Sequence, residues 1–363
     1  MKFFFASSAF LLCYLLHAQE IKGKIVDDKD NSLSGATIYF DGSTVGTLSR
    51  GDGTFAIEYK EQSNLTLVIR FLGFKTYYLP SPDPKSNYEI TLTPKENQLD
   101  EVVLDASPFT REEMLRAFKR DFLGRTKAGR RASILNEDDI RFYYDIEEKS
   151  LYASARQPIE VINKELGYKV EFDLVDFISD FYRVSLDKDD QKTNYFGGTS
   201  FFENIAEEED RRIKKKRLEA YKGSSMHFFK SLCSGQLEED KFQLFHKSFQ
   251  VPASSVFEIK KVKRKVRSSQ VLKAETYEDS YEITILGNDF ENLNIDSTSL
   301  KKKFQKKVSL LLKNNRSDIT FKTKVFYVDD YGNHTQISTI LFSGDMSKGR
   351  LGNMLPTNYQ PHD

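Results

Sequence analysis

The segment between residues 20 and 93 is built from short stretches whose side chains alternate between apolar and polar. In residues 54–59 (TFAIEY) and 88–93 (YEITLT), every second side chain is apolar. A period of two places these side chains on one face of an extended chain, which is typical of half-buried antiparallel strands. The stretch 65–71 is apolar almost throughout and predicts a centrally buried strand. Together with the turn-rich segments between them, these patterns predict about seven strands, which form a small β-sandwich.

Four ordered blocks in this segment carry a resemblance to a known domain family. They are residues 25–27 (IVD), 33–38 (LSGATI), 46–55 (GTLSRGDGTF) and 71–76 (FLGFKT). Together they resemble the carboxypeptidase regulatory-like domain, which is common at the N-termini of exported envelope proteins of Gram-negative bacteria. The resemblance implies a seven-stranded, transthyretin-like sandwich that accompanies peptidases but contains no peptidase site.

Residues 1–19 combine a short basic start, an apolar stretch over residues 3–16 and an abrupt return to polar residues at His17. This order predicts a secretory signal peptide that is cleaved near Ala18 or Gln19. The apolar stretch is shorter than the roughly 20 residues that a membrane anchor requires. We therefore expect export to the periplasm or the outer membrane. We expect no transmembrane segment in the mature chain, and peripheral membrane association stays open.

The charge of the chain is balanced, because its 54 Lys and Arg residues match its 54 Asp and Glu residues. No overall field attracts the chain to nucleic acid, so we expect no nucleic-acid partner. Basic residues do gather in three runs, at 211–217, 260–267 and 301–307. We interpret these runs as solvated faces, with an anionic lipid or lipopolysaccharide surface as the alternative.

The rest of the chain begins with a linker over residues 94–109, of which the first five residues are polar. Thr110 and Glu113 form a capping box, which predicts a helix that ends at Gly124. The apolar residues of this helix share one face, so we expect it to dock on a core.

Beyond this helix, alternating patterns predict strands over residues 139–183 and 256–342, including one strand over 319–328. A charged helix over 207–221 and a second short helix lie between them. The chain is therefore predicted to be mainly β, with the sandwich followed by a larger, antiparallel α+β domain over residues 110–363. Parts of this region resemble the bodies of envelope proteins whose role is not established, and whether it has one core or two stays open.

No motif of the sequence predicts catalysis, a cofactor or a metal. A zinc peptidase needs a His-x-x-Glu pair and a distant third ligand, and the one such pair, His17 and Glu20, lies at the predicted cleavage site. The sequence also lacks a phosphate-binding loop, a dinucleotide fingerprint and a Gly-x-Ser-x-Gly motif. The remaining histidines are isolated in sequence: His227, His246, His334 and His362. We predict no catalytic residue, no cofactor and no metal ligand.

Two further features have an ordinary structural interpretation. Without residues 1–19, Cys233 is the only cysteine, so no intramolecular disulfide is possible and we expect a buried, inert thiol. The cluster from Asp27 to Asn31 offers oxygen ligands for calcium. It lacks the Gly and the bidentate Glu of a calcium loop, so we interpret it as an Asx-rich turn.

Residues 221–229 (YKGSSMHFF) are the most distinctive candidate for a binding site, with Tyr221, Ser224 and His227 as candidate binding residues. The structural interpretation, which we favour, is a corner between two helices with Gly223 ending the first. Ser224 would then be the N-cap of the second helix and the two phenylalanines would enter the core. In this arrangement we expect His227 on the exposed side of the second helix.

These observations predict a non-catalytic, exported protein of the cell envelope with a binding or scaffolding role. The sandwich would act as a docking module, and the partner would be an envelope protein or a glycan. The alternative is an envelope hydrolase that acts on peptide or glycan, with a site assembled in the second domain from residues distant in sequence. Histidines that converge with carboxylates in one cleft would favour that alternative.

Overall fold

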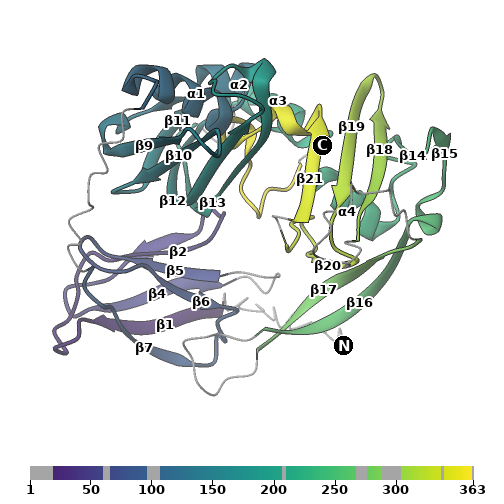
Figure 1. The fold of residues 1–363 in the computed structure, drawn as a ribbon. Helices are drawn as coiled ribbons and strands as arrows, with labels where there is room; N and C mark the ends of the chain where they lie inside the picture. Colours follow the sequence, from purple (N-terminus) through teal and green to yellow (C-terminus); the bar gives the residue numbers. More distant parts are fainter. Residues whose placement is uncertain are drawn as a thin grey trace, which may run out of the picture.

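The computed structural model describes residues 19–59, 66–95, 107–206, 210–266, 276–287, 304–336 and 339–361. Residues 1–18 of the predicted signal peptide and much of the predicted linker therefore lie outside the described residues, whereas Gln19 begins strand β1. The described chain is mainly β, as predicted, and its buried side chains form three hydrophobic clusters. Figure 1 shows the sandwich below the second group of strands and helices, with the third group beside them.

The N-terminal region is the predicted seven-stranded sandwich. One sheet has the order β4-β1-β7 and consists of β1 (Gln19–Val26), β4 (Thr54–Tyr59) and β7 (Asn87–Thr91). The other sheet has the order β3-β2-β5-β6 and consists of β2 (Thr37–Phe40), β3 (Gly46–Leu48), β5 (Thr66–Arg70) and β6 (Tyr77–Pro80). Their facing apolar side chains form one core, which includes Ile25, Ile57 and Ile69.

The middle of the molecule is a sheet covered on one face by helix α1 (Arg111–Leu123). Strand β12 (Tyr168–Phe181) pairs along its length with β13 (Gln191–Asn204). On its other side β12 pairs with β11 (Ile159–Asn163) and then with β10 (Ser150–Ala155), and β8 (Ser133–Ile134) and β9 (Ile140–Asp145) complete the sheet. Phe118 and Phe122 of α1 pack against aromatic rings of this sheet, so the helix docks on a core as predicted.

The third cluster lies between two sheets and helix α4 (Ser225–Ser234). The larger sheet has the order β15-β14-β18-β19-β21, with β14 (Phe242–His246), β15 (Phe249–Gln250), β18 (Lys306–Leu312), β19 (Asn315–Phe321) and β21 (Ile340–Gly344). The smaller has the order β16-β17-β20, with β16 (Phe257–Val266), β17 (Thr276–Ile285) and β20 (Val325–Val328). The described part of residues 110–363 therefore contains two hydrophobic clusters.

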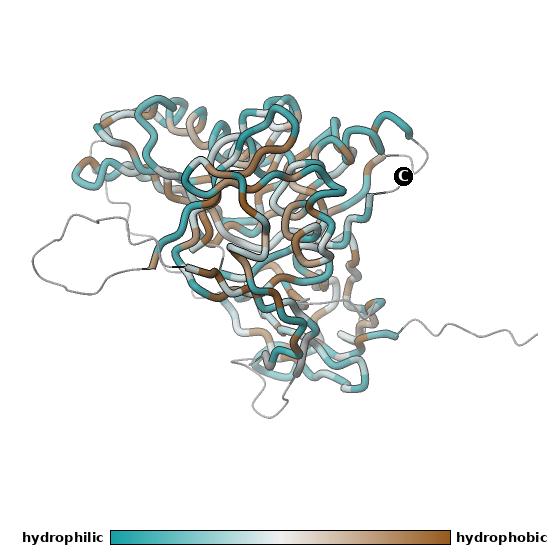
Figure 2. Tube along the Cα trace, turned by 90° about the vertical axis from the view of Figure 1, so that its right-hand side faces the viewer, coloured by the Kyte–Doolittle hydropathy of each residue, from teal (hydrophilic) through white to brown (hydrophobic). Residues whose placement is uncertain are grey.

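Shorter helical elements connect these layers. They are α2 (Lys127–Arg131), α3 (Arg211–Tyr221) and the 3-10 helices η1 (Glu137–Asp139), η2 (Lys188–Asp190), η3 (Ala253–Ser255), η5 (Met346–Lys348) and η6 (Leu351–Asn353). Among the described residues, no helix combines the length and the apolar character needed to cross a membrane. Figure 2 shows the apolar stretches concentrated inside the molecule and the hydrophilic ones along its outer loops.

The expectation of one strand over residues 319–328 is wrong. The chain leaves the larger sheet after Phe321 and enters the smaller sheet at Val325, so that β19 and β20 belong to different sheets. Lys322, Thr323 and Lys324 make the connection. The buried side chains change from odd-numbered positions, ending at Phe321, to the even-numbered Phe326 and Val328, so the phase of the alternation breaks at this polar corner.

The C-terminal segment (residues 345–361) leads from the third cluster back to the other two. Leu351 and Leu355 are buried in the middle cluster. The backbone N–H of Thr357 then donates to the carbonyl oxygen of Gly42 in the sandwich, at 2.7 Å. This segment therefore joins all three groups of strands.

The capping box predicted at the start of α1 is present in the structure. The Thr110 hydroxyl accepts from the Glu113 backbone N–H at 3.3 Å, and the Glu113 carboxylate accepts from the Thr110 N–H at 2.8 Å. We expect Thr110→Ala to lower the free energy of unfolding by about 1 kcal/mol, because the cap oxygen is lost. Thr110→Ser is the matched control and should retain most of the stability. Equal losses in both variants, measured by urea denaturation, would show that the cap hydroxyl is not the stabilising group.

Candidate binding cleft

The outer face of the second sandwich sheet is covered by the middle sheet. Tyr39 on β2 and its register partner Val68 on β5 are both fully buried, yet neither belongs to the sandwich core. The Tyr39 hydroxyl lies 3.1 Å from the Thr199 hydroxyl of β13, and its ring lies 5.2 Å from that of Phe201. Both faces of β2 are therefore buried, one in the sandwich core and one against β13.

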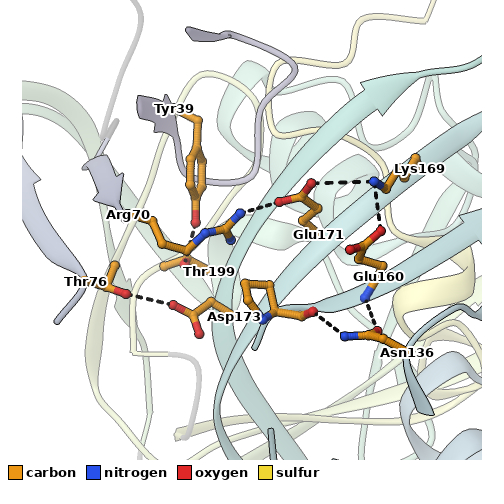
Figure 3. Close-up of polar contacts among 10 residues, drawn as sticks. Tyr39, Arg70, Thr76, Asn136, Glu160, Lys169, Glu171, Asp173 and Thr199 are labelled. Atoms are coloured by element: carbon orange, nitrogen blue, oxygen red, sulfur yellow. Dashed lines mark hydrogen bonds and ion pairs between the residues drawn. The ribbon is translucent and has the colours of Figure 1, made fainter. Parts of the chain in front are cut away.

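Polar contacts extend this interface along β12 (Figure 3). Arg70 of the sandwich forms an ion pair with Glu171, and Lys169 lies 3.7 Å from the same carboxylate. The Thr76 hydroxyl donates to Asp173 at 3.1 Å. The side chains of Arg70 and Glu171 are only 17% and 25% exposed, so their attraction is less screened than that of a surface pair. These contacts fix the sandwich in a defined orientation.

The turn after β2 pairs directly with the backbone of β13. We call residues 41–43 the junction turn. The Gly42 N–H donates to the Ser200 carbonyl at 2.6 Å, and the Phe202 N–H donates to the Ser43 carbonyl at 2.9 Å. The Asp41 carboxylate accepts from the Ser200 N–H at 2.8 Å. The junction turn thus continues the middle sheet beyond its edge strand.

The opposite side of the junction turn contacts the C-terminal segment through the Thr357–Gly42 hydrogen bond. Gly42 has a φ of 71°, and a Cβ at this position would overlap Cγ2 of Thr357. A residue with a side chain would therefore be both strained and too large here. The junction turn requires glycine at its centre because the φ of Gly42 is positive and because the turn is packed between β13 and the C-terminal segment.

A cleft of about 940 Å³ lies beside this junction, which is a volume that suits a small-molecule or short-chain ligand. Its walls come from every group of strands and from both the α3–α4 corner and the C-terminal segment. The lining includes Phe40, Asp41, Ser43, Gly198, Ser200, Glu219, Lys222, Ser224, Ser225, Arg264, Asp329, His334, Asp345, Lys348, Arg350, Asn353 and Thr357. The cleft is thus a composite site, whose shape depends on how the three groups are held together.

The predicted binding residues occupy the corner between α3 and α4, as the structural interpretation requires. Ser224 lines the cleft and is the N-cap of α4, where its hydroxyl accepts from the His227 N–H at 3.2 Å. Tyr221 is 5% exposed and lies in the middle cluster. The expectation of an exposed His227 is wrong, because this side chain is 6% exposed. Its ring lies between those of Tyr221 and Phe242, at 4.8 Å from each.

The polar neighbours of His227 give it a structural role. Its Nδ1 accepts from the Gly223 N–H at 3.1 Å, so the neutral ring carries its proton on Nε2, which lies 3.5 Å from Asp240. Burial lowers the pKa of His227, and Asp240 opposes this shift in part. Ser231 donates to Asp240 and to the His227 carbonyl rather than to the imidazole. The serine hydroxyl therefore contacts the carboxylate and not the imidazole, which is the base in a Ser–His–Asp triad.

The other histidines lie apart from one another. His334 lines the cleft, packs on Phe229 at 5.0 Å and has its pKa lowered by burial, whereas His246 lies 3.4 Å from the Lys307 carbonyl. His362 is outside the described residues. Within the described part of the chain, no three His, Cys, Asp or Glu residues lie together in a way that would hold a metal ion.

Two other sequence interpretations can be compared with the structure. Cys233 is half-buried against the third cluster, and burial raises the pKa of its thiol to about 12, so the reactive thiolate is disfavoured. The Asp27 carboxylate accepts from the backbone N–H groups of Lys29 and Asn31, each at 2.8 Å. This is the expected Asx-rich turn.

Comparisons with known proteins agree with the fold of the first region. The family model of the CarboxypepD_reg-like domain matches residues 21–104. The N-terminal sandwich is a carboxypeptidase regulatory-like domain. The match extends past residue 93, where the sequence patterns of the regulatory-like domain end.

Comparisons with curated proteins and with solved structures do not extend the similarity beyond the regulatory-like domain. None of the curated proteins matches the chain. Among solved structures, a chain of a type II cohesin–X–dockerin complex from Acetivibrio cellulolyticus matches with 18% identity and a TM-score of 0.17. The match covers 21% of this chain and 52%, or about half, of that chain. A likeness at this level carries no argument about fold or function.

The contact between the regulatory-like domain and β13 should depend on pH through Asp41. Burial raises the pKa of this carboxyl from its ordinary 3.8 to about 6, although the Ser200 N–H favours the charged form. The folded state therefore holds the proton more tightly than the unfolded state, and stability is lost as the pH rises from about 4 to about 6. In the variant Asp41→Asn the side chain no longer titrates, and its amide oxygen still accepts from the Ser200 N–H.

We expect the stability of Asp41→Asn relative to the wild type to rise across this pH window and then to level off. Urea denaturation of both proteins at each pH measures the difference. Asp52→Asn is the control: hydrogen bonds from Thr54 hold the pKa of Asp52 below its ordinary 3.8, so its stability relative to the wild type should be flat above about pH 4 and fall with rising pH only below that. A relative stability of Asp41→Asn that is flat or falls with pH would contradict the assignment.

Proposed function

We propose that this chain is a non-catalytic, exported protein of the cell envelope that binds a partner in the cleft. The observation that carries the proposal is the junction turn. It is hydrogen-bonded to β13 on one side and to Thr357 on the other, so it fixes the regulatory-like domain as one wall of the cleft. A wall held by backbone hydrogen bonds is preorganised and does not need to be ordered when a ligand binds.

The surroundings of the cleft support binding more than chemistry. Its lining mixes short polar side chains, backbone and both signs of charge, which suits an envelope protein segment or a glycan with many hydrogen-bonding groups. The basic and apolar start of the sequence supports export. In this proposal the regulatory-like domain is the docking module that completes the site.

For the hydrolase alternative, His334 is the histidine among the described residues that lines the cleft, and its Nδ1 lies 3.1 Å from the Thr335 carbonyl oxygen rather than on a carboxylate. The nearest grouping of a hydroxyl, a histidine and a carboxylate is Ser231, His227 and Asp240, and Ser231 is 2% exposed. A substrate does not reach a hydroxyl buried to this extent, and Ser231 contacts Asp240 rather than the imidazole that acts as the base in a catalytic triad. The hydrogen bonds of these three side chains stabilise the corner between α3 and α4.

A bulky residue at the mouth of the cleft tests the proposal. Ser225 lines the cleft at the start of α4, and Ser234 lies at the other end of the same helix outside the lining. We expect the tagged full-length chain, expressed in its native host, to fractionate with the envelope and to cross-link to a defined envelope component. Ser225→Trp should lose this component at least tenfold, whereas the matched control Ser234→Trp should keep it.

Two results would contradict the proposal. One is a wild-type chain that does not fractionate with the envelope. The other is a component that cross-links equally to both tryptophan variants, since binding would then occur outside the cleft. Circular dichroism melting of each variant shows that a loss of cross-linking does not come from unfolding.

A further inference from the structure

Most carboxylates that line the cleft are already engaged within the protein. Asp41 accepts from the Ser200 N–H, and Asp345 forms an ion pair with Lys348. Asp329 accepts from the N–H groups of Tyr331 and Asn333, each at 2.9 Å. Glu219 is paired with Lys216 at 2.5 Å. These acids have little need of a ligand to satisfy them.

Arg350 in the same lining is in the opposite situation. Its guanidinium is half-buried above the ring of Phe196, 5.9 Å from the centroid, and burial lowers its pKa. The nearby carboxylate of Asp121 has both oxygens bound by Arg120 at 2.7 Å, and Ser179 donates to one of them. Across the described residues, no hydrogen bond or ion pair reaches the Arg350 guanidinium. Asp121 acts on Arg350 through its charge alone, so the guanidinium keeps its N–H donors available to a carboxylate on the ligand.

Two more atoms in the lining lack partners. Oγ1 of Thr357 and Nη1 of Arg264 are both shielded from solvent, and neither has a hydrogen-bond partner in the described structure. A guanidinium nitrogen can only donate, and a hydroxyl can donate or accept. These two shielded atoms and the available donors of Arg350 all suit an acceptor on the ligand.

We infer that the Arg350 wall of the cleft is a subsite for a carboxylate carried by the ligand. The planar guanidinium can bind both carboxylate oxygens at once. The lining contains five carboxylates and four Lys or Arg side chains, so a ligand with several negative charges is repelled while one with a single charge is accepted. The carboxylate belongs to a peptide C-terminus or to an acidic sugar. The inference rests on the proposed function, since it names the chemistry recognised at the same cleft.

Isothermal titration with two pairs of probes tests the subsite. Trialanine is compared with trialanine amide, and galacturonic acid with its methyl ester, so that each pair differs at a single carboxylate. We expect one of the two acids to bind the full chain, which identifies the source, and its uncharged counterpart to bind at least tenfold more weakly. This comparison uses the wild-type protein and does not depend on the folding of a variant.

Variants then locate the carboxylate. Arg350→Gln should weaken the acid at least tenfold and leave the weak binding of the uncharged probe unchanged, and Arg350→Lys should recover part of the loss. Arg183→Gln is the matched control, because Arg183 is 75% exposed, lies outside the cleft and pairs with Asp190. It should bind the acid as tightly as the wild type does.

Three results would overturn the inference: an acid and its uncharged counterpart that bind equally, an Arg350→Gln variant that binds the acid normally, or no heat from either acid at 10 mM. Equal binding of both members of a pair, lost in Ser225→Trp, would leave the proposed function intact while removing the carboxylate subsite. The two proposals therefore fail separately.

Discussion

The structure depends on the junction turn, where residues 41–43 lie between β13 and the C-terminal segment. Two backbone hydrogen bonds connect this turn to β13, and a third connects it to Thr357. The three segments are far apart in sequence, with Asp41 and Ser200 separated by 159 positions. A single turn of the regulatory-like domain therefore fixes the position of the middle sheet and of the chain that returns from the third cluster. The cleft beside it exists because these segments meet there.

The contacts around the junction are polar, which affects what they contribute. Removing the charges of Arg70 and Glu171 from water costs much of what their attraction returns, so this pair contributes more to orientation than to net stability. The rings of Tyr39 and Phe201 and the fully buried Val68 supply the apolar part of the interface. The combination fixes one relative orientation of the regulatory-like domain without requiring a large apolar surface.

Local features could be predicted from the sequence because they depend on neighbouring residues. The strands of the sandwich, the capping box of Thr110 and Glu113 and the N-cap at Ser224 all follow from patterns a few residues long. The buried His227 could not be predicted in this way. Helix α4 lies between Tyr221 of the middle cluster and Phe242 of the third, so side chains on more than one of its faces are buried.

The cleft could not be predicted from the sequence, because its walls come from segments that lie far apart along the chain. One signal was nevertheless present. In β2 the consecutive residues Ile38, Tyr39 and Phe40 are all buried, and such a run indicates that both faces of a strand are covered. The residues Asp41, Gly42 and Ser43 are typical of a turn, but nothing in their own sequence indicates that the turn pairs with Ser200 and Thr357.

Residue-resolved amide hydrogen exchange tests the junction most directly. The account predicts that the amides of Gly42, Phe202 and Thr357 are strongly protected and exchange together, because one opening event exposes all three. The amide of Gly51 in an exposed turn of the same domain provides the unprotected reference. If Gly42 and Thr357 exchange as fast as Gly51, the junction does not hold the three groups of strands together, and the cleft is not a preformed site.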